Sequence, residues 1–324
     1  MPIYFPPSRA YVILTTHIVV AIISTLFTGL RFYTARFITR HIRADDYLLI
    51  AAWFLALVYS VLGSLSTNYG LGRHLWDVPV SVFSPTFMIL GAISGMFYGL
   101  SIMLTKLSLL TLFIRFTLWG SLRVVIYITM VIVVIYSLVA SFEWVYACRP
   151  LEKYWDHTIP GGSCINWLTI AVFSGVMNST TDVVMLILPV IILRNLRLPR
   201  RQKVGVMMVL MTGGLILVTS VIRLKRTLDW VDTTDITWQA VSTCMWGTIE
   251  VHMAVVCACL PAGKPFLRKY TPNIIRSSYG TSIRTKKYTI RSTQTQHLPS
   301  RDVDKDSQDI ILEDDLNSML QRHT

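Results

Sequence analysis

Charged residues are scarce in this chain. Asp, Glu, Lys and Arg make up 15% of its 324 residues, whereas they make up about a quarter of a soluble domain. Apolar residues make up 53%, and the mean hydropathy is +0.53. This composition disfavours an ordinary soluble domain and favours a protein that lies in a lipid bilayer.

The sequence also lacks the short signatures of several enzyme classes. No HExxH, GxSxG, P-loop or CxxC pattern occurs, which disfavours the hydrolase, nucleotidase and thiol-redox chemistries that use them. Cysteine is rare as well, with five in the chain. Cys244, Cys257 and Cys259 lie in the last apolar run, and nothing supplies further ligands at metal-site spacing. We therefore expect buried free thiols there and no metal site.

Long apolar runs take the place of those signatures. Each run reaches the roughly 18–20 residues that a helix needs to cross about 30 Å of hydrocarbon, where backbone must satisfy its own hydrogen bonds. The runs are Tyr11–Leu30, Tyr47–Ser66, Thr86–Ile114, Val124–Ala147, Trp167–Leu193, Val204–Ile222 and Ile236–Leu260. We predict an all-α membrane protein, a bundle of seven transmembrane helices.

The positions of Lys and Arg predict the orientation of this bundle. If the N-terminus lies outside, the inner segments hold most of these residues, with a dense group between residues 194 and 203. The N-terminus is therefore predicted outside and the C-terminus in the cytoplasm. The net charge of +12 then reflects inner segments that face anionic lipid, and we expect no nucleic-acid partner.

Composition also divides the chain into three parts. We expect a short extracellular N-terminus over residues 1–10 and the transmembrane domain over residues 11–263. From residue 264 to 324 we expect a cytoplasmic, largely disordered tail, because Ser, Thr, Arg, Lys and Gln come to dominate. The chain is thus a multi-pass integral protein of the plasma membrane or an endomembrane.

Two cysteines flank the predicted outer loop between the fourth and fifth helices. These are Cys148 and Cys164. The outer side of a membrane is oxidising, so we predict a disulfide between them that closes the loop.

Several polar residues fall inside the apolar runs. Asp182 and Glu250 lie near mid-membrane, where a charge costs about 2.5–3.5 kcal/mol, so each is expected to face the bundle interior and find a partner. In a structural interpretation, Lys106 pairs with Asp182 or Asp46, and Asn178 and Glu250 complete a buried polar network. In a functional one, Asp182 and Glu250 line a cavity that binds or protonates a ligand. The candidate network consists of Asp46, Lys106, Asn178, Asp182, Arg223, Trp246 and Glu250.

The stretch NYGLGRHLWDVP, residues 68–79, resembles a phosphate-binding turn at first sight. It falls at the outer end of the second helix, and no helix N-terminus follows its glycines at the required spacing. We predict instead that Gly70 and Gly72 end the helix in a left-handed conformation. Arg73 and His74 would then lie at the mouth of the bundle as an outer gate.

Taken together, these segments resemble one family. The matching pieces are RADDYLL, YGLGRH, TKLSLLTLFIRF, ACRPLEKYWD with GGSC, NSTTDVVMLILPV, SVIRL and WGTIEVHMAVVCACLPAGKP. Over about residues 10–270 the chain resembles the fungal rhodopsin-domain integral membrane proteins. That group includes receptor-like surface sensors and many proteins encoded in toxin and other secondary-metabolite gene clusters.

This resemblance implies a receptor-like protein of a secondary-metabolite pathway. It would sense a small, apolar ligand or pathway intermediate and contact a cytoplasmic signalling partner. An alternative is an intramembrane cyclase or isomerase in which Asp182 and Glu250 serve as acid and base. A transport accessory is a third hypothesis. The predicted seventh helix has no lysine that could bind retinal, so no cofactor is expected.

Overall fold

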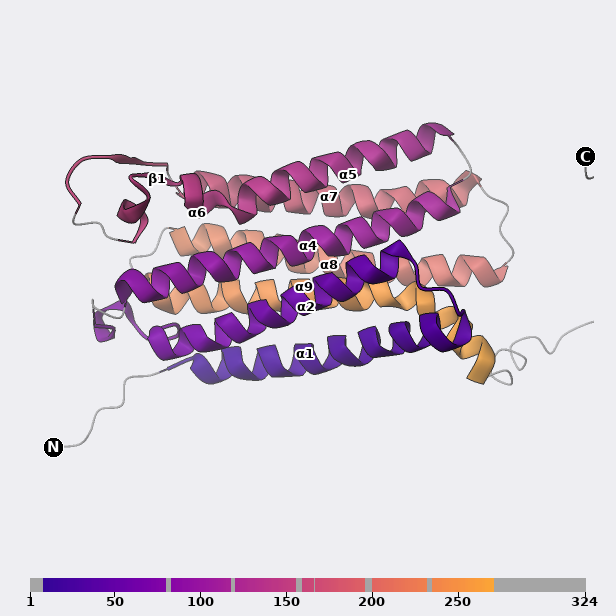
Figure 1. The fold of residues 1–324 in the computed structure, drawn as a ribbon, viewed down its shortest axis with the longest axis horizontal. Helices are drawn as coiled ribbons and strands as arrows, with labels where there is room; N and C mark the ends of the chain where they lie inside the picture. The colour runs from indigo at the N-terminus through magenta and orange to yellow at the C-terminus, as the bar shows by residue number, and fades with distance from the viewer. Residues whose placement is uncertain are drawn as a thin grey trace, which may run out of the picture. The chain divides into compact units, whose positions relative to one another are not determined.

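Long helices dominate the computed structural model, which describes residues 8–79, 83–117, 120–155, 159–165, 167–195, 200–231 and 235–270. Within these ranges, seven helices of more than twenty residues run alongside one another (Figure 1). They are α1 (Ala10–Tyr33), α2 (Ala44–Ser66), α4 (Met88–Phe116), α5 (Gly120–Ser141), α7 (Trp167–Asn195), α8 (Arg200–Val231) and α9 (Ile236–Tyr270). The prediction of an all-α fold is confirmed.

Short elements join the long helices. A π-helical turn, η1 (Thr34–Ile38), follows α1, and another, η4 (Phe83–Phe87), leads into α4. The remaining elements are η2 (Thr67–Tyr69), η3 (Leu75–Asp77), α6 (Glu143–Tyr146), β1 (Cys148–Arg149), η5 (Leu151–Tyr154) and β2 (Ser163–Cys164).

Six segments in the described residues are long and apolar enough to cross a bilayer. They are Ala10–Ile38, Ala44–Tyr69, Pro85–Arg115, Gly120–Ser141, Thr169–Ile192 and Ile236–Pro261. The protein is therefore a multi-pass integral membrane protein. Helix α8, which contains the predicted sixth run, is not among the six, so the count of seven spans stays a prediction.

Helix α9 lies at the centre of the packing. It contacts α1 and α8 on its flanks and also α2 and α4, while α2 packs on α4, α4 on α5, and α7 on α8. The outward faces carry exposed apolar side chains such as Leu26 on α1 and Ile135 on α5. In a bilayer these faces contact lipid, so they need no further covering.

Helix α2 ends near the glycines at which the sequence predicts a helix end. Gly70 adopts a left-handed conformation with φ of 112°, and Gly72 has φ of 91°. A Cβ atom on Gly70 would also lie 2.8 Å from a methyl of Val78, so a larger residue is excluded by both backbone and space. The stretch ends a helix, as predicted, and its backbone amides bond within the protein: Gly72 donates to the carbonyl of Thr237.

A small hairpin between α6 and α7 holds the predicted disulfide. Strands β1 and β2 pair antiparallel with Cys148 opposite Cys164. The two sulfurs are joined and close a loop over a sequence separation of 16 residues. Figure 1 shows this hairpin at the same end of the bundle as the start of α1, which we call the hairpin end.

The predicted domain boundaries are not tested. Helix α9 continues to Tyr270, past the expected start of the tail at residue 264. Its extension includes Lys264 and Lys269, but the apolar span itself ends at Pro261 and contains no lysine. The tail from residue 271 onward lies outside the described residues, as does the N-terminus up to residue 7.

The disulfide between Cys148 and Cys164 should stabilise the folded protein. Replacing Cys148 and Cys164 together by alanine should lower the free energy of unfolding by up to about 3 kcal/mol, because the unfolded loop regains its freedom. Thermal unfolding of the detergent-purified protein measures this change. Cys244→Ala, which removes a free thiol, is the matched control. The prediction fails if a reductant lowers the melting temperature of the double variant as much as that of the wild type.

Candidate functional site

Lys106 is the centre of a buried polar cluster. Its ammonium group lies 2.8 Å from Asp182 Oδ1 and donates hydrogen bonds to Asn178 Oδ1 and to Thr181 Oγ1, each at 2.8 Å. The Asn178 carbonyl at 3.0 Å and the Tyr136 hydroxyl at 3.2 Å complete its surroundings. Lys106 comes from α4 and its partners from α5 and α7, so this one side chain ties three helices together.

Asn178 extends this cluster to a second ion pair. Its side-chain oxygen accepts from Lys106, while its Nδ2 donates to Glu250 Oε1 at 2.7 Å and to Ser220 Oγ at 2.9 Å. Glu250 Oε2 in turn lies 2.6 Å from Arg223 Nε. The result is an unbroken sequence of contacts across α4, α7, α8 and α9, which we call the charge chain: Asp182, Lys106, Asn178, Glu250 and Arg223.

The formal charges of the charge chain sum to zero. Two carboxylates face one ammonium and one guanidinium, and Asn178 joins them through its amide. Burying a charge without a partner costs several kcal/mol, and this cost falls when both partners are buried together with full hydrogen bonding. Glu250 is fully buried and Lys106 is 5% exposed, so the pairing is a condition for placing these residues in the bundle interior.

An aromatic layer covers the Arg223 end of the charge chain. The guanidinium lies 5.2 Å from the ring centre of Tyr98, and the rings of Tyr98 and Tyr59 are 5.5 Å apart. Gly247 makes room for this layer, because a Cβ atom there would lie 3.0 Å from the Tyr59 hydroxyl. Space for the aromatic rings therefore depends on a glycine one turn before Glu250.

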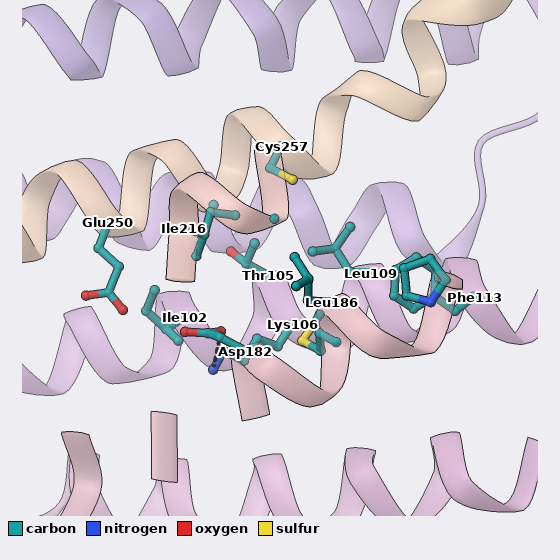
Figure 2. Close-up of a pocket in the computed structure, with 14 residues that line it drawn as sticks. Ile102, Thr105, Lys106, Leu109, Phe113, Asp182, Leu186, Ile216, Glu250 and Cys257 are labelled. Carbon is teal, nitrogen blue, oxygen red and sulfur yellow. Dashed lines mark ion pairs between the residues drawn. The ribbon is translucent and has the colours of Figure 1, made fainter. Parts of the chain in front are cut away.

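A cavity begins at the other side of the charge chain. It extends from Glu250 to Phe113, with the Lys106–Asp182 ion pair along its wall (Figure 2). The space between its atoms, including the part open to the surroundings, is about 570 Å³. Apart from Thr105, Lys106, Asp182 and Glu250, the lining is apolar: Ile102, Leu109, Phe113, Met185, Leu186, Pro189, Gly213, Ile216, Ala254 and Cys257.

The structure brings together five of the seven residues predicted for the polar network. Lys106, Asn178, Asp182, Arg223 and Glu250 form the charge chain. Of the two alternatives for Lys106, the ion pair with Asp182 forms. Asp182 and Glu250 each pair with a cation, as the structural interpretation expects. Both also line a cavity, as the functional interpretation expects. Ligand binding by these residues stays a prediction.

Asp46 and Trp246 lie apart from that group. Asp46 pairs with Arg31 at the end of the bundle opposite the hairpin, and the half-buried Trp246 is not part of the cavity lining. The first turn of α2 explains the position of Asp46, because its Oδ2 accepts from the backbone amide of Arg43 and so caps the helix.

Arg31 is a buried residue that the sequence reasoning missed. It directly follows the first apolar run, where a loop charge is expected, yet it is 5% exposed. Its Nε lies 2.8 Å from Asp46 Oδ1 and its Nη2 lies 2.7 Å from Asp45 Oδ2, while Nη1 donates to the carbonyl of Ala258. Arg115 of α4 also contacts this cluster, since its Nη1 lies 3.3 Å from Asp45 Oδ1. The paired aspartates at the start of α2 were the signal that a buried cation lies nearby.

A second missed feature is a chain of hydrogen bonds between α1, α2 and α9. The two nitrogens of His252 lie 2.8 Å from Ser24 Oγ and from Ser60 Oγ. His17 contacts the Ser60 carbonyl and Thr248 Oγ1, each at 2.8 Å. These two histidines stand inside apolar runs, which is the signal that marks them as buried polar residues.

Arg73 and His74, the predicted gate, attach the end of α2 to the beginning of α9. The His74 ring stacks on Trp238 at 4.1 Å and on Trp76 at 4.6 Å, and its Nδ1 contacts Asp235. The carbonyl of Arg73 accepts from the hydroxyl of Thr237. A gating role for these residues stays a prediction.

The described residues hold no group of three or more His, Cys, Asp or Glu side chains that could bind a metal ion.

Comparison with known proteins agrees with this architecture. Residues 30–269, about three quarters of the chain, match the fungal rhodopsin domain. The chain belongs to this family. The match covers all the helices that form the charge chain and the cavity, so these features lie within the family domain.

Several named relatives share most of the family domain. Receptor GIN3 of Arthrobotrys oligospora is 23% identical over 276 residues, covering 85% of this chain and 67% of the relative. Polyenoic acids biosynthesis gene cluster protein Ba17b of Metarhizium anisopliae is 26% identical, covering 76% of this chain and 71% of the relative. A SAT4 family membrane protein of Emericella nidulans is 27% identical, covering 65% and 54%. Relatives of this fungal rhodopsin protein thus include a named receptor and a gene-cluster protein.

Arg31 predicts a large loss of stability when it is replaced. Arg31→Met leaves two buried aspartates without their main partner, so the free energy of unfolding should fall by about 3–5 kcal/mol. Arg36→Met, at an exposed position in the same segment, is the control and should change little. Denaturant titration in detergent measures both. Equal losses in the two variants would contradict the role of Arg31.

The Lys106–Asp182 pair predicts a compensated double variant. Lys106→Met alone leaves a buried carboxylate unpaired and should cost about 3–5 kcal/mol, whereas Lys106→Met/Asp182→Asn removes both charges and should cost less than the single variant. A double-mutant cycle of unfolding free energies decides this. If the two single losses simply add, the ion pair does not carry the stability.

Proposed function

We propose that this fungal rhodopsin protein is a seven-span, receptor-like protein that binds a small, mostly apolar molecule in the cavity beside the charge chain. The observation that carries the proposal is the cavity itself, a mainly apolar space, partly open to the surroundings, that meets a buried charged network at one wall. Ligand sites are typically apolar clefts with a few polar groups that fix orientation. The named receptor among the relatives supports the same assignment.

The orientation follows from two independent features. The disulfide of Cys148 and Cys164 lies at the hairpin end, and disulfides persist on the oxidising side of a membrane. Lys and Arg gather in the segments at the other end, which favours the cytoplasmic side for them. We therefore assign the hairpin end to the outside and the C-terminal end of α9 to the cytoplasm.

This orientation needs an odd number of spans, and α8 supplies the seventh. Its 32 residues correspond to about 48 Å at 1.5 Å per residue, more than the roughly 30 Å of a hydrocarbon core. It packs between α7 and α9, both of which contain spans. Its Arg223 and Ser220 contribute to the charge chain, and this pairing offsets the cost of a charge in that helix.

Ligand binding fits the geometry better than acid–base catalysis by Asp182 and Glu250. A buried general acid has to stay neutral before it donates its proton. Both carboxylates instead lie within ion-pair distance of a cation, at 2.8 Å and 2.6 Å, which favours their charged forms. Among the residues that the structure describes, no contact favours a transport accessory. The names of cluster-encoded relatives support an association with a secondary-metabolite pathway. A receptor that binds a molecule of such a pathway would have this association.

Two neighbouring glycines provide a matched test. Gly213 lines the cavity, and a Cβ atom there would lie 3.2 Å from Leu186, whereas a Cβ atom on Gly214 would meet nothing within 4 Å. Gly213→Val should therefore fill the cavity and reduce ligand binding about tenfold or more, while Gly214→Val should bind as the wild type does.

An octanol carrying an alkyl diazirine is a suitable probe for this comparison. Full-length protein in lipid nanodiscs is irradiated with the probe, and the labelled residues are mapped by mass spectrometry. We expect labels on Met185, Leu186 and neighbouring cavity residues. Labelling that is unchanged in Gly213→Val, or that falls equally in both valine variants, would overturn the proposed site.

A further inference from the structure

One oxygen on the cavity wall has no hydrogen-bond partner. Asp182 Oδ1 contacts Lys106, but Asp182 Oδ2 is buried without a donor, and the Asp182 side chain is only 7% exposed. The hydroxyl of Ser220 lies near Asp182 and interacts with it, but it forms no direct hydrogen bond with Oδ2. Ser220 Oγ accepts from Asn178 Nδ2 and shares a hydrogen bond with Ser179, in which either hydroxyl can donate. A buried carboxylate oxygen without a hydrogen bond costs free energy of folding, and a donor that reaches it would remove this cost.

The other charged and hydroxyl groups on the cavity wall are already engaged. Glu250 uses one oxygen for Asn178 and the other for Arg223. Lys106 has more acceptors around it than it has protons to donate. Thr105 donates to the carbonyl of Ser101. Among these wall groups, Asp182 Oδ2 is therefore the one strong acceptor without a donor.

The charge balance decides which kind of donor fits this acceptor. The charge chain is neutral as it stands, so an ammonium ligand would add an uncompensated positive charge on the far side of a carboxylate already paired with Lys106. A carboxylate ligand would face Asp182, and two like charges about 4 Å apart repel by about 4 kcal/mol at an effective dielectric constant near 20. A neutral hydroxyl satisfies the oxygen without changing the charge.

We propose that the cavity binds a neutral, mainly hydrocarbon alcohol whose hydroxyl donates to Asp182 Oδ2. Its hydrocarbon part would extend along Leu109 and Met185 toward Phe113, which lies two turns of α4 from Lys106 and so about 10 Å away. This ligand class rests on the proposed function, because it assumes that the cavity is a binding site.

The proposal predicts a ranking of head groups on one hydrocarbon chain. A hydrogen bond to a charged group is strong enough that losing it should weaken binding about tenfold or more. 1-Octanol should therefore displace the diazirine probe at concentrations about tenfold lower than octyl methyl ether, octylamine or octanoic acid, at matched membrane concentrations of each compound. The wild-type protein in nanodiscs suffices for this comparison, so it does not depend on whether a variant folds.

A charge-neutral variant adds a reversal of preference. In Lys106→Met/Asp182→Asn, the carboxylate acceptor is replaced by an amide that can donate. The affinity of octyl methyl ether relative to that of 1-octanol should therefore rise. Gly214→Val serves as a control and should keep the wild-type ranking.

Each outcome bears on one of the two claims. A clear advantage of octanol over the other three compounds supports the proposal. Equal displacement by octanol and its methyl ether would overturn the hydroxyl assignment while leaving the cavity as a binding site, and a preference for octylamine or octanoic acid would overturn the argument from neutrality. Failure of every compound to displace the probe, or labelling that ignores Gly213→Val, would overturn the proposed function together with this inference.

Discussion

The ion pair of Lys106 with Asp182 is the interaction on which the interior of this protein depends. Lipid offers no solvation to a charge, so the four charged groups of the charge chain have to neutralise one another inside the bundle. Asn178 makes this possible, because its amide accepts from Lys106 and donates to Glu250 at the same time. Through these contacts the charge chain joins α4, α7, α8 and α9.

The cavity is a consequence of the same arrangement. Charged groups hold the four helices together at mid-bundle, while toward Phe113 the facing residues are apolar and Gly213 leaves space between α7 and α8. At the end of the bundle opposite the hairpin, Arg31 ties α1 to α2 and α9 through two aspartates and a carbonyl. A molecule in the cavity would touch the charge chain, which joins α4, α7, α8 and α9. In the proposed receptor-like function, this contact would transmit occupancy along those helices.

The sequence predicted the broad fold because bilayer thickness dictates the length of apolar runs. It also predicted the disulfide and the helix stop at Gly70, since both depend on local signals. Lys106 had two possible partners, because spacing along α7 cannot fix how α2 and α7 sit around α4. The roles of Arg31 and His252 were not predicted. Arg31 follows an apolar run, where a loop charge is expected, and His252 bonds to residues more than 190 positions away. Such pairings depend on helix packing, which no single run reveals.

The charge state of Asp182 and Glu250 tests the account most directly. Infrared spectra of the full-length protein in nanodiscs distinguish an ionised carboxylate from a neutral carboxylic acid, and the variants Asp182→Asn and Glu250→Gln assign the bands. Each variant is predicted to remove intensity from the carboxylate band at neutral pH and leave the carboxylic-acid band unchanged. Loss of a carboxylic-acid band in either variant would contradict the neutral charge chain and would favour the acid–base alternative.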